Sequence, residues 1–231
     1  RVLFRSAVLC GFGGMALVLQ PTVAAQQLAA GLVGLAGGNI RNIALGAAFL
    51  AADPRLVWCT LTGFGPRSSR PGYDFVVQGE SGLMSITGES EGAPMKVGVA
   101  LVDVLAGKDA TIAILGALAA RANGPTPAER RRLFVSLYHT AAAALVNVAQ
   151  NTLVGGQAPR RWGNAHPNLV PYQLFAARDR GVVIAVGNDG QWANLCRVLG
   201  LTELSADPAV ATNSGRLAHR DRVVEAVGHA V

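Results

Sequence analysis

The chain has 231 residues, of which 51% are hydrophobic and 15% are charged, so it has enough apolar material for a packed core and does not have the composition of a disordered protein. Its formal net charge is +6, but no basic stretch is interleaved with aromatic residues, and we expect no nucleic-acid partner. The three cysteines (Cys10, Cys59 and Cys196) are too far apart for a disulfide framework, which favours the cytoplasm, and the four histidines show no metal-ligand spacing, so no metal is expected.

Residues 1–52 have an unusual composition that leaves three interpretations open. Two arginines precede an apolar run at residues 7–19, and no charged residue occurs from position 7 to position 40, which is typical of an export signal. Glycines and a Gln-Pro pair interrupt the run, so a membrane span is not expected. The alternatives are a buried pair of Ala- and Gly-rich helices, and a damaged or divergent stretch of the gene, because residues 1–6 resemble translated sequencing-adapter DNA.

From position 53 onward the pattern is that of an α/β protein. Residues 56–61 are β-formers bounded by turn residues and predict a short strand. A helix is predicted to begin within residues 73–83, with Asp74 near its positively polarised end. Residues 97–120 form a long apolar segment with recurring small residues, and we expect a buried helix that packs closely on a neighbour.

The second half of the chain continues the alternation of strands and helices. The predicted elements are a strand at residues 133–137, an Ala-rich helix at residues 140–153, a strand at residues 181–186 and a helix at residues 191–199 that Asn188 or Asp189 can cap. Three consecutive arginines at positions 130–132 are interpreted as a solvated run. Residues 155–171 form a long loop rich in glycine and proline, and loops of this length are often functional.

Three blocks of sequence, taken together, resemble one known family. The first is residues 53–65, DPRLVWCTLTGFG. The second begins at Arg70 with RPGYDF and continues to Asp103. The third begins at Arg161 with RWGNAHPN and continues through VPYQ and GND to Arg216. In this order they resemble the family III CoA-transferases (CaiB/BaiF type), and they are most similar to the branch that acts on dicarboxylate CoA esters such as succinyl-CoA.

The resemblance implies an α/β fold in which part of a parallel-sheet CoA-binding domain leads into a smaller α/β domain. Residues 1–52 stay unassigned, residues 53–154 are expected in the large CoA-binding domain, and residues 155–231 are expected to form an active-site flap and a truncated small domain. Relatives are much longer, so the chain is expected to be a fragment. The resemblance also implies no permanently bound cofactor, a CoA thioester and a carboxylic acid as substrates, and an interlocked homodimer if the protein is intact.

In the family reaction, as the resemblance implies it, an aspartate carboxylate attacks the acyl-CoA thioester and forms a covalent acyl-enzyme. The position of that aspartate corresponds here to His139, in the segment FVSLYHT. An imidazole can attack a thioester or act as a base for water, but an acyl-imidazole is prone to hydrolysis. We therefore expect normal CoA transfer to be lost. The alternative role of His139 is to cap the start of the following helix.

A second group of candidate residues lies in the long loop and just beyond it. By resemblance, this segment corresponds to a glycine-rich flap that covers the active site and excludes water. The flap candidates are Gly163, Asn164, Ala165, His166 and Gln173. Because His166 and its two successors replace some of the family's glycines, a stiffer flap is expected. The alternative is an ordinary surface loop.

Tyr73 and Asp103 are candidate pocket residues, because related CoA-ester racemases carry a proton-moving His and Asp at these positions. A tyrosine has a reference pKa of about 10 and is a poor base near neutral pH, which argues against the racemase branch. The alternative for Asp103 is an acid in the helix interior paired with an arginine. Three functions remain: a CoA-transferase for small dicarboxylic acids, a non-catalytic CoA-binding partner subunit or fragment, and a 2-methylacyl-CoA racemase.

Overall fold

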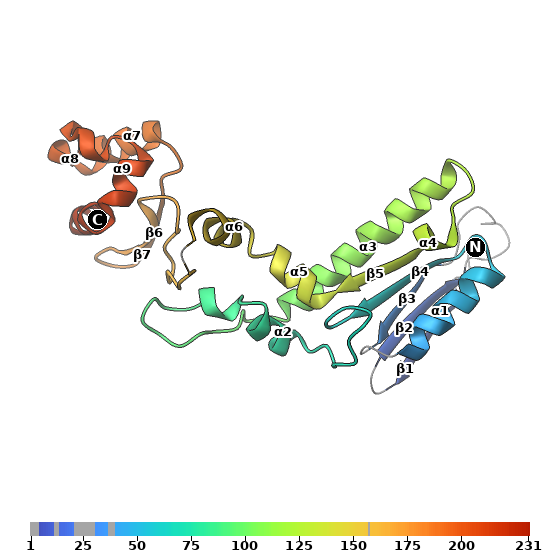
Figure 1. Ribbon diagram of the computed structural model, residues 1–231. Helices are drawn as coiled ribbons and strands as arrows, with labels where there is room; N and C mark the ends of the chain where they lie inside the picture. Colours follow the sequence, from blue (N-terminus) through green and yellow to red (C-terminus); the bar gives the residue numbers. More distant parts are fainter. Residues whose placement is uncertain (1–4, 12–13, 21–30, 37–39, 157) are drawn as a thin grey trace. The chain divides into compact units, whose positions relative to one another are not determined.

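The computed structural model describes residues 5–11, 14–20, 31–36, 40–156 and 158–231. The chain divides into two compact units, which are described separately (Figure 1). The first unit comprises Arg1–Thr87 and Pro94–Pro159. The second comprises Gly88–Ala93 and Arg160–Val231.

A five-stranded sheet forms the centre of the first unit (Figure 1). In their order across the sheet, the strands are β1 (Arg5–Gly11), β2 (Gly14–Gln20), β3 (Gly31–Ala36), β4 (Val57–Thr62) and β5 (Arg132–Ser136). The pairs β1–β2 and β2–β3 are antiparallel, whereas the pairs β3–β4 and β4–β5 are parallel. All six residues of β4 are buried, as expected for a parallel strand inside a sheet.

Helices connect the parallel strands of the first unit and cover the sheet. They are α1 (Ile40–Ala52) between β3 and β4; α2 (Asp74–Glu80), a 3-10 turn at Met84–Ile86, α3 (Leu101–Ala122) and α4 (Ala128–Arg131) between β4 and β5; and α5 (Leu137–Ala143) and α6 (Val146–Gly155) after β5. The predicted strands at residues 56–61 and 133–137 and the helix beginning near Asp74 are confirmed.

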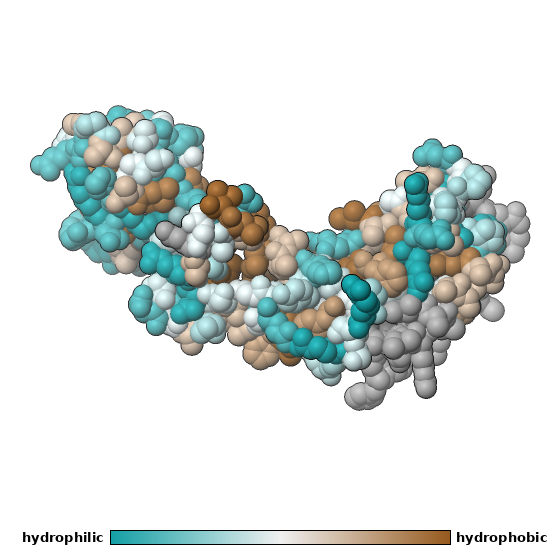
Figure 2. Space-filling model, in the orientation of Figure 1, coloured by the Kyte–Doolittle hydropathy of each residue, from teal (hydrophilic) through white to brown (hydrophobic). Residues whose placement is uncertain are grey.

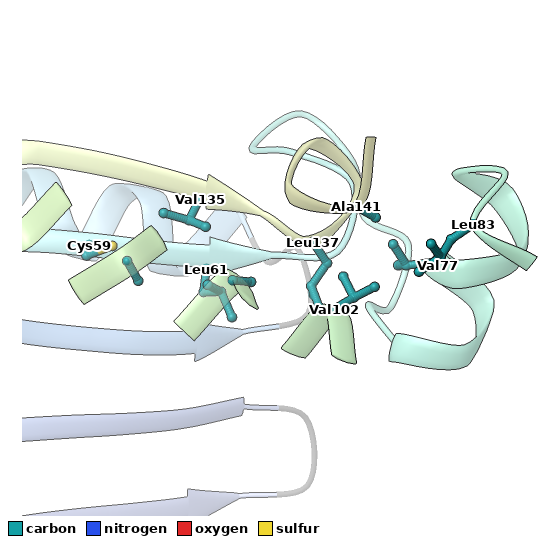
Figure 3. Close-up of a cluster of buried hydrophobic side chains, with 10 residues drawn as sticks. Cys59, Leu61, Val77, Leu83, Val102, Val135, Leu137 and Ala141 are labelled. Atoms are coloured by element: carbon teal, nitrogen blue, oxygen red, sulfur yellow. The ribbon is translucent and has the colours of Figure 1, made fainter. Parts of the chain in front are cut away.

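The core of the first unit lies between α3 and the strands β4 and β5. The buried side chains come from β4, β5, α2, α3, α5 and the turn before Met84 (Figure 3). Along α3, Val102, Ala106 and Ala110 recur at four-residue intervals and face this core. The predicted buried helix is buried on this face only, because Ile112 and Leu115 on its other face are 69% and 59% exposed.

Two further sequence interpretations are corrected in this unit. The described part of residues 1–52 does not form a pair of helices, because β1, β2 and β3 are strands and only α1 is helical. The export-signal and damaged-gene interpretations stay predictions. The single helix predicted at residues 140–153 is two helices, α5 and α6, separated by a turn after which Val146 has a φ of 42°. Figure 2 shows an apolar surface over α6, where Leu153 and Val154 are 82% and 77% exposed.

The arginine run at positions 130–132 is not solvated as a whole. Arg131 is only 5% exposed. Its guanidinium donates hydrogen bonds to the backbone carbonyl oxygens of Leu50, Asp53, Leu56 and Thr126, at 2.8–3.3 Å. The prediction fails here because three of the four acceptors come from a distant segment, which local composition does not reveal. Arg131 therefore ties the end of α1 and the approach to β4 to α4.

The second unit combines a two-stranded hairpin with four helices among its described residues. Its elements are β6 (Tyr172–Ala176), β7 (Gly181–Ala185), α7 (Asp189–Leu199), α8 (Thr202–Ala206), a 3-10 turn at Pro208–Val210, α9 (Asn213–Ala218) and α10 (Arg220–Ala230). The predicted strand at residues 181–186 and the predicted helix at residues 191–199 are confirmed. Of the two candidate caps of this helix, Asn188 is the N-cap, because its Oδ1 accepts a hydrogen bond from the N–H of Gln191 at 2.9 Å. The strand β6 was not predicted.

A separate core holds the second unit together. Phe175 of β6 and Trp192 of α7 pack with Val223 and Val227 of α10, all at most 4% exposed. Both units thus combine helices with a sheet, and the predicted α/β class is confirmed. Among the described helices, none has both the length and the apolar character needed to cross a bilayer.

Candidate active site

The turn between β5 and α5 carries His139. Ser136, the last residue of β5, is the N-cap of α5, and its Oγ accepts a hydrogen bond from the N–H of His139 at 3.5 Å. The same hydroxyl donates to the carbonyl oxygen of Gly63 at 3.2 Å. His139 itself is exposed in the first turn of α5. The capping side chain of this helix is therefore Ser136, and His139 does not have the capping role that was its alternative.

The turn that follows β4 lies against the turn that follows β5. The N–H of Tyr138 donates to the carbonyl oxygen of Gly63 at 2.9 Å. The ring of Tyr138 lies 6.0 Å from that of Phe64 and 6.3 Å from that of His139. Because β4 and β5 are parallel and end level, with Thr62 paired to Ser136, both turns lie at the carboxyl edge of the sheet. Ligands of open α/β sheets bind at this edge.

An arginine lies beside these aromatic rings. The Cζ atom of Arg70 is 3.9 Å from the ring centroid of Phe64. Arg70 also forms a two-pronged ion pair with Glu80, in which Nη1 lies 2.9 Å from Oε2. The hydrogen bonds from Arg70 lower the pKa of the Glu80 carboxyl. The pair is exposed, so it contributes little to stability but fixes the guanidinium near the turn.

The structure places Tyr73 and Asp103 at two adjoining helix starts. Tyr73 is the N-cap residue of α2 and is 66% exposed, and Asp103 lies in the first turn of α3. Asp74, which follows Tyr73, joins the two helices because its Oδ2 accepts hydrogen bonds from the N–H groups of Val102 and Asp103, at 2.8 and 3.3 Å. Partial burial raises the pKa of the Asp103 carboxyl, and the negative charge of Asp74 raises it further.

The flap candidates Gly163, Asn164, Ala165, His166 and Gln173 lie in the second unit. The N–H of Gly163, whose φ is +56°, donates to the carbonyl oxygen of Gly88 at 3.1 Å. Arg161 donates to the carbonyl oxygens of Glu89 and Gly92, at 3.1 and 2.6 Å. Gln173 is half-buried in β6, opposite Ile184. The first part of this segment is therefore held by backbone acceptors of residues 88–92.

His166 is fixed on both sides of its ring. Its Nδ1 accepts a hydrogen bond from the N–H of Asn168 at 3.0 Å, and the ring lies 5.2 Å from that of Tyr172. Arg220 donates to the carbonyl oxygens of His166 and Pro167, both at 3.0 Å. Burial lowers the pKa of the imidazole, and the positive charge of Arg220 lowers it further. His166 thus acts as an acceptor that orders the backbone at Asn168.

Arg216 anchors the backbone at Val170, near the end of the segment that contains the flap candidates. This side chain is fully buried and donates to the carbonyl oxygens of Val170, Val210 and Ala211, at 2.8–3.2 Å, and it pairs with Asp189 at 2.9 Å. The Val170–Pro171 peptide bond is cis. The hydrogen bonds of Arg216 therefore join the backbone at Val170 to the backbone at residues 210–211 and to Asp189.

Sequence reasoning missed Ser136, the hydrogen bonds by which Asp74 joins α2 to α3, and the anchoring role of Arg216. A serine three residues before His139 is a cap signal that could have been recognised. The role of Asp74 could not, because its acceptor function depends on how α2 meets α3. Among the described residues, no group of three or more His, Cys, Asp or Glu side chains is arranged to hold a metal ion.

Comparison with known proteins identifies the family. The sequence profile of CoA-transferase family III matches residues 34–231. The chain is 42% identical over 174 residues to a succinate–glutarate CoA-transferase of Agrobacterium fabrum, which covers 74% of this chain and 43% of that protein. It is 38% identical over 177 residues to a succinyl-CoA:glutarate CoA-transferase of Mus musculus, which covers 74% of this chain and 39% of that protein. The chain belongs to CoA-transferase family III, and it spans about two fifths of the length of these relatives.

Solved structures agree with this assignment. A CaiB/BaiF family protein from Brucella suis is 39% identical, with a TM-score of 0.60 over 80% of this chain and 49% of that one. A hypothetical protein from Mycobacterium tuberculosis is 24% identical and has a TM-score of 0.68, over 84% of this chain and 53% of that one. The second similarity supports the fold.

Proposed function

We propose that this chain binds the CoA thioester of a small dicarboxylic acid at the carboxyl edge of β4 and β5, as part of a CoA-transferase. The observation that carries the proposal is the position of His139, exposed in the turn where β5 meets α5 and tied through Ser136 to the turn after β4. The two relatives described above are named as transferases of succinate or succinyl-CoA and glutarate. Their names support a small dicarboxylic acid as the acyl group.

The imidazole of His139 determines what chemistry can follow. If its neutral nitrogen attacks the thioester carbonyl, an N-acyl bond forms, the C–S bond breaks and CoA leaves as a thiolate that takes up a proton. Water then attacks the acyl-imidazole and releases the free acid. A carboxylate nucleophile can instead return CoA to the enzyme as a thioester, whereas an imidazole has no acyl carbon on which CoA could be held. We therefore propose that transfer is lost and that the residual reaction is slow hydrolysis.

A second candidate function is a CoA-binding partner subunit or fragment without catalysis, and the presence of His139 favours it. We assign the first unit to CoA binding, and the second unit to the flap (Gly163 to Gln173) and the small domain. The racemase alternative is disfavoured, because Tyr73 is largely exposed and would have to act as a base.

The deciding experiment is hydroxylamine trapping with succinyl-CoA, comparing the parent chain with His139→Asp. In the variant, an enzyme-bound CoA thioester would be converted to a hydroxamate on the peptide that contains position 139. The parent can form only free succinyl hydroxamate, since an imidazole cannot become a hydroxamate. His229→Asp, an exposed position on α10, is the matched control for the change in charge.

Modification of that peptide in His139→Asp alone would support an inactive transferase fold. If neither chain binds succinyl-CoA in equilibrium dialysis, the proposed function is wrong. Exchange of the α-hydrogen of a 2-methylacyl-CoA for deuterium would revive the racemase alternative.

We also propose a location, an oligomeric state and a cofactor requirement. A cytoplasmic location accords with Cys59 and Cys196, which are both free thiols. A homodimer follows from the resemblance, and sedimentation of the chain would test it. We propose no resident cofactor, because CoA enters and leaves as a substrate.

A further inference from the structure

A cavity of about 300 Å³ lies in the second unit at the start of α10. Three arginines line it, Arg160, Arg220 and Arg222, together with one carboxylate, Asp221. The other lining residues are Trp162, Leu217, Ala218 and His219. This volume is at the lower end of the range of about 300–1,000 Å³ that is typical of small-molecule sites. A small, charged ligand would therefore fit the cavity better than a large apolar one.

Two of the arginines gather around one indole. The Cζ atom of Arg160 lies 3.8 Å from the ring centroid of Trp162, and that of Arg220 lies 4.4 Å from it. Each contact is favourable on its own, because the face of an indole attracts a cation. The two guanidinium groups repel one another, however, and this repulsion lowers the pKa of Arg220 in addition to the larger effect of burial. A bound anion would relieve both effects.

The guanidinium of Arg220 also has one nitrogen that donates no hydrogen bond among the described residues. Its Nη2 donates to the carbonyl oxygens of His166 and Pro167. Its Nη1 is buried and has no hydrogen-bond partner among the described residues. A buried donor without a partner is unfavourable, and a guanidinium can bind an oxyanion through two parallel hydrogen bonds. The third arginine, Arg222, is already paired with Asp207 at 2.6 Å.

We propose that this cavity is a binding site for a small oxyanion with two negative charges, held by Arg160 and Arg220 beside Trp162. The anionic oxygens replace the missing partner of Arg220 and neutralise the pair of guanidinium groups. A short dicarboxylate and a phosphate share this chemistry. The site is independent of the proposed CoA transfer, since its residues are all in the second unit and its occupation needs no thioester.

The test is isothermal titration calorimetry of the full chain with glutarate and, separately, with inorganic phosphate, at constant chloride concentration. At least one of the two probes is expected to bind saturably at one site. Arg160→Gln is expected to weaken that binding about tenfold or more, as the loss of a charge-assisted contact does. Arg178→Gln, at an exposed arginine between β6 and β7, removes the same charge elsewhere in the unit and is expected to leave the affinity unchanged.

Two outcomes would overturn the site. One is the absence of saturable binding of either probe. The other is equal affinity in Arg160→Gln and the parent chain. His139→Ala separates this site from the proposed transfer site: a glutarate signal lost in His139→Ala but kept in Arg160→Gln would belong to the transfer site and contradict this proposal. Because Arg220 also holds the flap backbone, Arg160→Gln is the decisive variant, and circular dichroism verifies that it is folded.

Discussion

The backbones of Gly63 and Gly72 lie in direct contact. A Cβ atom on either residue would lie 2.5 Å from the Cα atom of the other. Gly63 follows β4, and its carbonyl oxygen accepts from both Ser136 and Tyr138. The turn after β4 can therefore pack this closely against the residues before α2 only because neither glycine has a side chain.

Gly63→Ala is expected to destabilise the protein by about 1–3 kcal/mol, as overpacking of a close contact does. Gly107→Ala is the matched control: Gly107 is an exposed position inside α3, where a Cβ meets nothing within 4 Å. That substitution is expected to stabilise by roughly 0.5–1 kcal/mol, because alanine favours the helix. Urea unfolding of both variants measures the difference. Equal midpoints would show that the contact is not as tight as described.

Arg131→Met is expected to cost about 3 kcal/mol or more, because it leaves four buried or partly buried carbonyl oxygens without their donor. Its neighbour Arg130 is exposed, and Arg130→Met is expected to change stability by less than about 0.5 kcal/mol. The comparison of the two unfolding midpoints isolates the buried position. A similar, small effect of both substitutions would mean that the run is solvated after all.

The stability of the second unit is expected to fall as the pH drops below about 6.5. The pKa of His166 is lowered from its ordinary value of 6.5. Between the folded and the unfolded pKa the unfolded chain binds more protons, so the free energy of unfolding decreases with decreasing pH in that window. Protonation of Nδ1 also removes the acceptor of the Asn168 N–H.

Urea unfolding at pH 7.5 and pH 5.5 measures this dependence. The parent chain is expected to lose more stability between the two pH values than His166→Gln. His229→Gln, at an exposed histidine near the end of α10, is expected to behave like the parent. An unchanged pH dependence in His166→Gln would exclude His166 as the source.

Cys59 is expected to resist alkylation in the folded chain. Its side chain is fully buried in β4, and burial raises the pKa of its thiol to about 11. The reactive thiolate is therefore scarce at pH 8. Burial likewise raises the pKa of Cys196. Peptide mapping after iodoacetamide treatment, with and without urea, provides the measurement. Equal labelling rates of Cys59 in both conditions would contradict the burial.

Local sequence signals were sufficient for the strand β4, the long helix α3 and the Asn188 cap, because each depends on residues close together in the chain. They were insufficient for Arg131, since three of its four acceptors lie far away along the chain. They were also insufficient for the break before Val146, where the alanine-rich pattern continues across a turn. The fold class came from the alternation of strands and helices.

The candidate site was predictable in part. The resemblance directed attention to His139, and the turn after β5 is where the structure has it. The hydrogen bond between Asp74 and Asp103 depends on tertiary packing, as does the contact of both Arg160 and Arg220 with Trp162. No periodicity or spacing encodes such a meeting, because the residues belong to different elements.

Residues 88–93, GESEGA, belong to the second unit although the chain on both sides belongs to the first. The backbone therefore passes between the units at positions 87/88, 93/94 and 159/160. Domain dissection by a single cut is ruled out as a result. In a recombinant fragment that begins at Arg160, Arg161 would lose its hydrogen bonds to the carbonyl oxygens of Glu89 and Gly92. Such a fragment would need residues 88–93 to be added as a peptide or joined to it by a linker.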